Sequence, residues 1–161
     1  MKSMSPKPEC PPAVPGRELR IRPMTPGDFE PLHALLSRPD VMRYLEAPYT
    51  REQTSAFLRR ACSEDPPVLA AEADGAFIGY VIFHPWDPAS IEIGWVLFPE
   101  YWGRGYASAL TDMLIQIARE KGKQPVIECV PAQKATAHIA GKFGFVRTET
   151  RDGLDVYRLI R

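Results

Sequence analysis

The chain has 161 residues, and its 20 basic and 20 acidic side chains give a formal net charge of zero. A chain of this length can bury the core of one domain. No apolar run approaches the ~20 residues that a membrane-spanning helix needs, and no basic stripe of the kind that binds nucleic acid stands out. We therefore expect neither a membrane nor a nucleic acid as a partner.

The cysteines and histidines indicate the compartment and the absence of a metal. Cys10, Cys62 and Cys129 are odd in number and widely spaced. Neither they nor the three histidines have the spacing of metal ligands, so we expect no metal. The start of the chain lacks the apolar segment of a signal peptide. Together with the cysteine pattern, this predicts a cytoplasmic protein.

The chain begins with a proline-rich stretch. Five prolines fall within residues 1–16, which offer few apolar side chains to a core. This composition is typical of a flexible or polyproline-like tail. The remainder, residues 17–161, is predicted to form a single domain.

The first half of this domain is predicted to contain one strand and three helices, at Leu19–Pro23, Pro26–Ser37, Val41–Leu45 and Thr50–Ser63. Thr25 is placed to cap the first helix, and Thr50 to Gln53 form a capping box for the last one. A hairpin follows at Val68–Ala73 and Ala76–Phe83. Its Asp-Gly link is the preferred two-residue turn.

The second half is predicted to alternate strands and helices, at Ile91–Phe98, 105–121, Pro125–Val130, Lys134–Phe143, Phe145–Thr150 and Leu154–Ile160. Gly122 is a natural C-cap for the longer helix, and Asp152-Gly153 turns the last hairpin. With the short helix at Val41–Leu45 left out, the resulting order is βααβββαβαββ. It places one parallel crossover, from Ile91 to Val130, in an otherwise mostly antiparallel sheet.

A strand, a glycine-rich turn and a helix start follow one another in residues 91–108. Gly103 and Gly105 allow the backbone to approach a ligand closely, and the helix start offers unpaired N–H groups and a positive dipole end to a phosphate. Two nucleotide motifs do not fit. No strand ending in an acidic residue follows at the distance that the dinucleotide fingerprint needs, and there is no Gly-Lys-Ser/Thr of a P-loop.

The turn resembles a known acyl-CoA motif. Residues Trp102-Gly103-Arg104-Gly105-Tyr106-Ala107 are similar to the Gln/Arg-x-x-Gly-x-Gly/Ala motif of the GNAT N-acetyltransferases. Trp102 replaces Gln or Arg, as in the ribosomal-protein-type (RimJ/RimL-like) branch. Further segments resemble that branch in the same order, so that the likeness covers about residues 18–161: Leu19–Asp28, Pro39–Leu45 and Lys142–Phe145.

The resemblance implies an α/β (α+β) fold with a mixed, mostly antiparallel central sheet and helices on both faces. It also implies acetyl-CoA as cosubstrate, held where the strand of Glu92 and the strand of Val126–Val130 splay apart. Pantetheine would pair with the first of these strands, and pyrophosphate would meet the N–H groups of the turn. The residues implied in binding are Trp95, Val96, Leu97, Gly103, Arg104, Gly105, Tyr106, Ala107, Gln133 and Thr136.

Glu92 lies where several family members carry a glutamate general base. We expect it to act as the base or as an anchor for the acceptor amine; the alternative is an exposed strand glutamate. Glu128 is a second carboxylate on the neighbouring strand, and a backbone N–H near Val96 would stabilise the carbonyl oxygen. Ala140 replaces the tyrosine that often serves as general acid, so the acid is open among Tyr157, Tyr44 and Tyr49.

The function predicted is acetyl-CoA-dependent N-acetylation of a primary amine, and the branch resemblance favours a protein N-terminal α-amine. An α-amine with a pKa of 7.7–8.0 is roughly a tenth neutral at pH 7, whereas a lysine is neutral well under one part in a thousand. Two alternatives stay open. One is a small-molecule amine, such as an antibiotic or polyamine, as acceptor; the other is an acyl-CoA-binding sensor without turnover. We expect a monomer or homodimer.

Overall fold

The structure is a computed structural model, and it describes residues 18–160. The tail predicted at residues 1–16 lies outside the described residues. The described part contains one sheet of seven strands: β1 Leu19–Arg22, β2 Val68–Ala73, β3 Ala76–Asp87, β4 Ser90–Leu97, β5 Gln124–Cys129, β6 Val146–Arg151 and β7 Leu154–Arg158. Its α-helices are α1 Phe29–Leu36, α2 Pro39–Met42, α3 Arg51–Ala61, α4 Tyr106–Glu120 and α5 Lys134–Lys142. Two short 3-10 turns are η1 Pro26–Asp28 and η2 Pro99–Tyr101.

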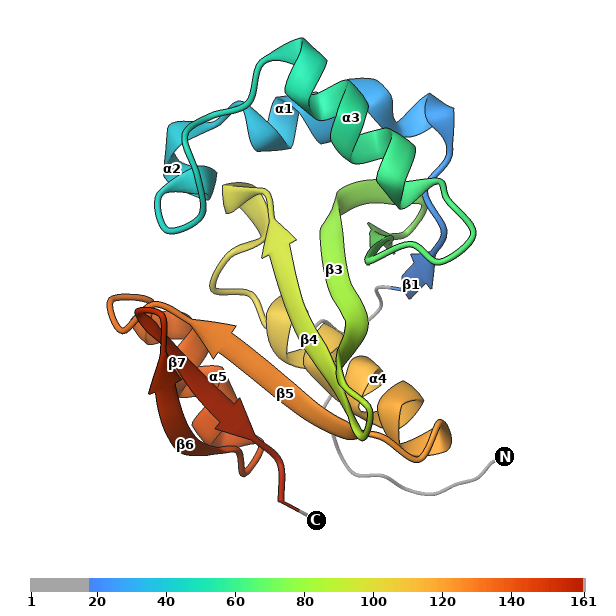
Figure 1. Cartoon of the computed structure of the whole chain (residues 1–161). Helices are drawn as coiled ribbons and strands as arrows, with labels where there is room; N and C mark the ends of the chain where they lie inside the picture. Colours follow the sequence, from blue (N-terminus) through green and yellow to red (C-terminus); the bar gives the residue numbers. More distant parts are fainter. Residues whose placement is uncertain (1–17, 161) are drawn as a thin grey trace.

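The strands are arranged in the order β1-β2-β3-β4-β5-β7-β6 (Figure 1). Every neighbouring pair is antiparallel except β4 and β5, which the crossover helix α4 connects in parallel. The predicted mixed, mostly antiparallel sheet with a single parallel pair is therefore confirmed.

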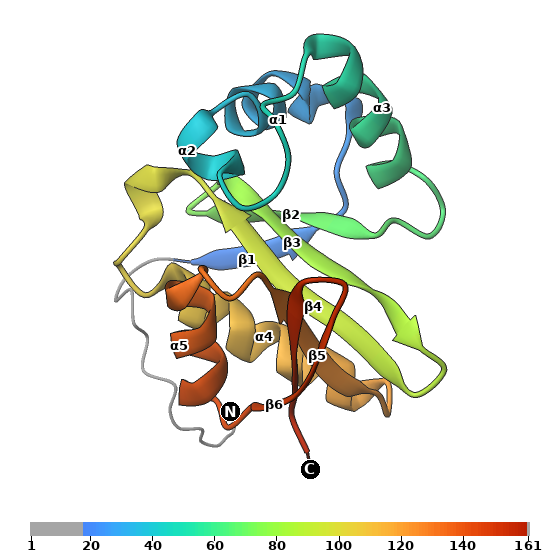
Figure 2. The same ribbon diagram turned by 60° about the vertical axis from the view of Figure 1, so that its left-hand side comes forward.

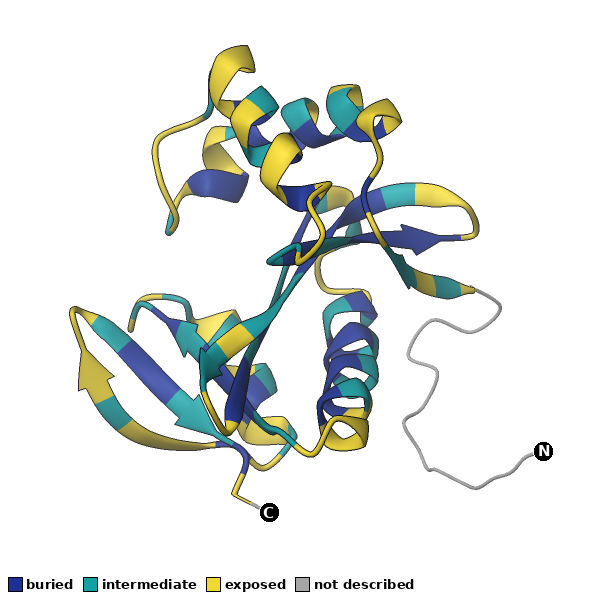
Figure 3. Ribbon diagram, turned by 45° about the vertical axis from the view of Figure 1, so that its right-hand side comes forward, coloured by how far each residue is buried: buried dark blue, intermediate teal, exposed yellow. Residues whose placement is uncertain are grey.

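Helices cover both faces of the sheet. In Figure 2, α1, α2 and α3 lie on one side of the strands, and α4 and α5 lie on the other. Residues of β4 alternate between two hydrophobic clusters: Ile91, Ile93 and Leu97 pack with α4, while Val96 packs with α1 to α3. Buried residues recur along α4 from Tyr106 to Ala118, and the last turn of the helix is exposed at its end (Figure 3). Among the described residues, no helix is long and apolar enough to cross a membrane.

The helix cap and the two hairpin turns predicted from short sequence motifs are present in the structure. The side chain of Thr50 accepts the N–H of Gln53 at 3.1 Å, and the Gln53 side chain accepts the N–H of Thr50 at 2.8 Å, which completes the predicted capping box. Both predicted hairpin turns have two residues with positive φ, 51° and 85° at Asp74 and Gly75, and 54° and 82° at Asp152 and Gly153. Positive φ at both positions defines the turn type that matches the twist of a hairpin.

Several predicted boundaries differ from the structure, and three of these differences have a local physical cause. The helix expected from Pro26 begins as the turn η1, because Pro31 has no N–H to donate to the Gly27 carbonyl. The short helix expected at Val41–Leu45 starts at Pro39, whose fixed φ suits a first helical position. The strand expected to end at Phe83 continues to Asp87, with a register irregularity after Pro85 that accommodates a residue without a backbone donor.

An ion cluster ties the first strand to its surroundings. The Arg22 guanidinium donates to both carboxylate oxygens of Asp28 at 2.9 Å, and its Nε donates to Glu72 at 2.5 Å. Asp28 also accepts the N–H of Thr25. The hydrogen bond from Arg22 lowers the pKa of Asp28, whose residue is buried. Each charge in this cluster has an opposite charge within the protein.

Candidate active site

The parallel strands β4 and β5 pair over a short stretch and then separate. Their register joins Ser90, Ile91 and Glu92 to Gln124, Pro125 and Val126, although both strands continue beyond these positions. From Ile93 onward, β4 has a neighbour only on its β3 side. The splayed gap expected from the sequence is thus present.

The backbone of β4 alternates between the two sides of this gap. Phe98 donates its N–H to the carbonyl of Ile78, so even-numbered residues of β4 bond to β3 and odd-numbered residues face the other way. Consistent with this, the carbonyl of Ala89 accepts the N–H of Gln124 on β5. The backbone groups that face the gap therefore belong to Ile93, Trp95 and Leu97.

The two residues that follow Trp95 show the same alternation. A Cβ atom placed on Gly79 of β3 would lie 2.1 Å from the carbonyl oxygen of Val96, which therefore points at β3. The indole Nε1 of Trp102 donates to the Leu97 carbonyl oxygen at 2.9 Å. Near Val96, the N–H groups that face the gap are therefore those of Trp95 and Leu97. These two are the candidates for the backbone donor that was expected to stabilise the carbonyl oxygen.

The glycine-rich turn lies between the end of β4 and the start of α4. Gly103 and Gly105 have φ of 69° and 89°, the left-handed region that favours glycine. The first helical hydrogen bond runs from the Ala109 N–H to the Gly105 carbonyl, so the amides of residues 106–108 precede the helical ladder. Arg104 is exposed, whereas the Tyr106 side chain is buried against Tyr101. Tyr106 can therefore offer only its backbone to a ligand.

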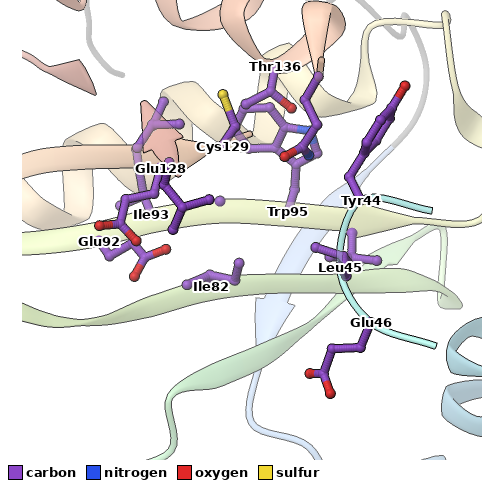
Figure 4. Close-up of a pocket in the computed structure, with 15 residues that line it drawn as sticks. Tyr44, Leu45, Glu46, Ile82, Glu92, Ile93, Trp95, Glu128, Cys129 and Thr136 are labelled. Carbon is purple, nitrogen blue, oxygen red and sulfur yellow. The ribbon is translucent and has the colours of Figure 1, made fainter. Parts of the chain in front are cut away.

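A cavity of about 290 Å³ opens in the gap (Figure 4). Of the residues predicted to form the site, Glu92, Trp95, Val96, Gln133 and Thr136 line it. The cavity lining also includes Tyr44, Glu46, Glu128 and Cys129. The turn at Gly103–Ala107 and the buried Leu97 do not line this cavity; they belong to the adjoining end of β4 and the start of α4.

Within the described residues, the side chain of Glu92 pairs with a histidine. His84 and Glu92 are opposite each other in the β3–β4 register, and His84 Nε2 lies 3.1 Å from Glu92 Oε1. The other ring nitrogen, Nδ1, lies 3.0 Å from the Pro85 carbonyl oxygen. The hydrogen bond with Glu92 raises the pKa of His84 above its ordinary value, against the opposing effect of burial.

Glu128 has a neutral partner. Trp86 Nε1 donates to Glu128 at 2.8 Å, and the guanidinium groups of Arg151 and Arg158 lie 4.7 and 4.4 Å from the centroid of the indole ring. These contacts hold the indole, which comes from the end of β3, against side chains of β5, β6 and β7. In Figure 4, the carboxylates of Glu92 and Glu128 point into the same part of the cleft.

Glu46 comes from the loop between α2 and α3, and it accepts the hydroxyl of Tyr49 at 3.1 Å. Three glutamates thus line the cavity, and no arginine or lysine is among its lining residues. Their hydrogen-bond partners are a phenol, an imidazole and an indole. A cationic ligand entering this cavity would meet three carboxylates, none of which forms an ion pair with an arginine or lysine of residues 18–160.

The remaining candidates have simpler positions. The Gln133 side-chain oxygen accepts the N–H of Val130 at 2.9 Å, so its NH₂ group is the part left for a ligand. Of the three tyrosines considered as general acid, Tyr44 lines the cavity; Tyr49 donates to Glu46, and Tyr157 packs against the core cluster beside α4. Burial raises the pKa of the Cys129 thiol to about 11, so it remains protonated near neutral pH and is unsuited as a nucleophile.

A sheet that splays beside a glycine-rich helix start forms a binding site for an extended cosubstrate that carries phosphate. The family model described as "Acetyltransferase (GNAT) domain" matches residues 18–146. The chain therefore belongs to the GNAT acetyltransferases: it is an N-acetyltransferase that uses acetyl-CoA.

Individual relatives agree with this assignment. The chain is 27% identical over 138 residues to the uncharacterized N-acetyltransferase YnaD of Bacillus subtilis, with 81% of each chain covered. The GNAT-family acetyltransferase structure from Bacillus anthracis has 26% identity and a TM-score of 0.76, covering 87% of this chain and 92% of that one. The spermidine N-acetyltransferase of Vibrio cholerae, in complex with CoA and spermine, shares the fold at 20% identity and a TM-score of 0.71, with 87% and 92% covered.

Sequence reasoning missed His84 and Glu46. His84 was placed after the end of a strand, because the strand was predicted to stop at Phe83. The available signal was the β3–β4 hairpin itself: extending both strands toward Ser90 brings His84 opposite Glu92. Glu46 lies in a loop, where no periodic pattern places a side chain.

Proposed function

We propose that this enzyme transfers the acetyl group of acetyl-CoA to the α-amine of a protein N-terminus, and that the cavity between β4 and β5 receives that amine. The observation that carries the proposal is a lining with three glutamates and no arginine or lysine. An acceptor amine arrives mostly as a cation. Such a lining attracts the cation and holds it beside Glu92.

The residues assigned to acetyl-CoA suit its chemistry. The gap-facing backbone of Trp95 and the N–H of Leu97 can pair with the amides of an extended pantetheine arm. The amides from Gly103 to Ala107 can donate to pyrophosphate, and the exposed Arg104 adds a cation. Bound in this way, acetyl-CoA supplies an acetyl group activated as a thioester. Side chains that would border the arm are Val96, Gln133 and Thr136.

We assign to Glu92 the role of the base that takes a proton from the acceptor amine. Its side chain is 16% exposed, points into the cleft, and lies beside the position at which the strands separate. A positioned base typically contributes 10²–10⁴-fold to the rate. The N–H of Trp95 or Leu97 is placed to stabilise the oxygen of the reacting carbonyl.

We place the chain in the RimJ/RimL-like branch. The support is Trp102, which occupies the first motif position. Its Nε1 holds the Leu97 carbonyl, so the tryptophan shapes the end of β4 instead of presenting a side-chain amide or guanidinium to a phosphate. The cytoplasmic location and the monomeric or homodimeric state stay predictions.

A small polyamine or another polycationic amine is the second candidate acceptor. One observation favours it: the three cavity glutamates come from a loop and two different strands, so they can meet more than one positive charge. The Vibrio cholerae relative with the same fold is a spermidine N-acetyltransferase. The third candidate, a sensor without turnover, gives no role to the hydrogen-bonded pair of Glu92 and His84.

A thiol-release assay with acetyl-CoA separates these candidates. The amines tested are tetrapeptides with free N-termini, spermine and spermidine, and an aminoglycoside. Release with peptides alone supports the first proposal, and release with spermine or the aminoglycoside supports the second. Acetyl-CoA binding without release from any amine would support the sensor.

The binding of CoA to the turn is tested with Gly103→Asp, and Gly122→Asp is the matched control. Both glycines have φ near 70°, and an added Cβ would meet no atom within 4 Å at either position. The two substitutions therefore impose similar backbone strain, but only the first adds a negative charge near the pyrophosphate position. We expect calorimetry to show CoA affinity reduced by about tenfold or more in Gly103→Asp, equal to about 1.4 kcal/mol. Equal affinity in both variants would contradict this assignment.

A further inference from the structure

The imidazole of His84 is held between two oxygen atoms. Nδ1 lies 3.0 Å from the Pro85 carbonyl oxygen, and Nε2 lies 3.1 Å from Glu92 Oε1. A carbonyl oxygen can only accept, so Nδ1 carries hydrogen. Nε2 then faces a carboxylate, and a hydrogen bond between these two atoms requires one proton that they share.

We infer that His84 and Glu92 form a composite base, in which the proton taken from the acceptor amine passes through Glu92 and comes to rest on His84. The inference rests on the proposed function, since it concerns the base of that same reaction. His84 acts through Glu92 and does not need to touch the substrate. Its side chain is 36% exposed against 16% for Glu92, so it is the partner that can return the proton to solvent.

The proton balance supports this assignment. An acceptor R–NH₃⁺ gives one proton to the pair formed by the neutral imidazole of His84 and the carboxylate of Glu92. The freed amine then attacks the thioester carbonyl. The C–N bond forms, the C–S bond breaks, and the electrons of the C–S bond leave on sulfur. A second proton leaves nitrogen and neutralises the thiolate, so that the products are the amide and CoA-SH. The pair then carries the first proton as imidazolium and carboxylate, which is the arrangement that the two observed contacts satisfy.

A composite base is better matched to an amine than a lone glutamate. General bases work best when their pKa lies near the working pH, and an isolated glutamate titrates near 4.3. The hydrogen bond with Glu92 raises the pKa of His84 above 6.5, toward that of an α-amine. The position of His84 beside Glu92 therefore sets the proton affinity of the composite base.

The groups around His84 come from four elements. Glu92 on β4 and Glu128 on β5 both favour its protonated form. Arg60 on α3 and Tyr80 on β3 line, with His84 and Glu92, a separate cavity of about 210 Å³. Tyr80, whose pKa burial raises, is neutral throughout the range of interest.

Nuclear magnetic resonance of the full chain labelled with ¹⁵N-histidine tests the shared proton without any acceptor. His33 and His138 serve as internal references. We expect the His84 midpoint to lie above 6.5 in the wild type and to fall by about one pH unit in Glu92→Gln, because the charged partner is lost. An unchanged His84 midpoint in Glu92→Gln would refute this inference alone.

The pH profile of kcat/KM tests the relay. The assay uses acetyl-CoA with a tetrapeptide or spermine, whichever is turned over, and compares the wild type with His84→Gln and the exposed-helix control His138→Gln. We expect the midpoint of the acid limb of the kcat/KM profile to move to lower pH, by about one pH unit or more, in His84→Gln only. A profile that falls in height without moving would make His84 a packing residue and overturn the inference. Absence of thiol release from every amine would instead refute the proposed function, whatever the histidine titration shows.

Discussion

Among the described residues, two groups of carboxylates differ in their partners. Asp28 and Glu72 share the guanidinium of Arg22, whereas Glu46, Glu92 and Glu128 are hydrogen-bonded by Tyr49, His84 and Trp86. In the first group a fixed cation balances the negative charge. In the second group the partners are neutral or titratable, and the negative charge is available to a ligand.

Under the proposed function, carboxylate side chains serve stability in the first group and substrate binding in the second. Removing one member of an ion cluster leaves its partner's charge unbalanced, which costs stability. Removing a carboxylate held only by a neutral donor costs little stability, but it takes away the charge that a cationic substrate would meet. The two groups should therefore respond in opposite ways to substitution.

The largest effect is expected for Glu92→Gln. The change keeps the shape of the side chain but removes the base, so kcat/KM should fall about 10²–10⁴-fold. Acetyl-CoA affinity and the thermal unfolding midpoint near pH 8 should stay close to those of the wild type. Steady-state kinetics and thermal denaturation provide both numbers. If kcat/KM stays within about twofold across pH 6 to 9, Glu92 is an ordinary strand residue.

Asp28→Asn should produce the reverse pattern. Loss of the bidentate partner of Arg22 should lower the free energy of unfolding by about 1–3 kcal/mol, with kcat/KM at low temperature little changed. Chemical denaturation measures the first quantity. A large loss of activity at a temperature where the variant is fully folded would show that the two groups are coupled.

The two groups should also differ in pH dependence. The pKa of Asp28 is lowered, so its contribution to stability is present above its ordinary value and is lost as the pH falls through the lowered one. The pKa of His84 is raised, so the contribution of its pair with Glu92 is full below 6.5 and is lost as the pH rises through the raised value. Denaturation of the wild type, Asp28→Asn and Glu92→Gln at pH 3, 5.5 and 8.5 measures how the free energy of unfolding lost in each variant depends on pH. The same pH dependence in both variants would contradict the distinction between the two groups.

Glu46→Gln should have a moderate effect. Glu46 lines the cavity and is exposed, so its loss should raise KM for the amine by about three- to tenfold through weaker attraction, with kcat nearly unchanged. Glu30→Gln is a useful control, because Glu30 is an exposed glutamate paired with Arg51 outside the cavity. Equal changes in both variants would indicate only a general charge effect.

The smallest effect is expected from deleting residues 1–16. Their composition offers little to a core, so the unfolding midpoint should move by less than about 2 °C and CoA affinity should be unchanged. Thermal denaturation and calorimetry of the shortened chain measure both. A fall of more than about 5 °C would show that this segment packs on the domain.

The sequence predicts features that depend on local chemistry. The two Asp-Gly turns, the capping box at Thr50 and the glycine-rich helix start each lie within a few residues of chain, and the structure contains all of them. The position of Glu92 on the strand beside the gap could also be predicted. The ion cluster of Arg22 could not, because Glu72 lies 50 residues away and joins it only through the pairing of β1 with β2. His84 was missed for the same physical reason: its partner is set by cross-strand register, and an error of four residues in a strand end removed it.

The central claim is that the cavity glutamates select a cationic acceptor, and matched acceptors test it most directly. Two tetrapeptides with the same free N-terminus, one with lysine and one with glutamate at the second position, are compared by kcat/KM; spermine and its singly acetylated form provide the equivalent pair for small amines. The account predicts that the more cationic member is favoured by about tenfold or more, and that this preference shrinks in Glu46→Gln and Glu128→Gln. Equal kcat/KM for both members of each pair, or a preference that persists in both variants, would contradict it.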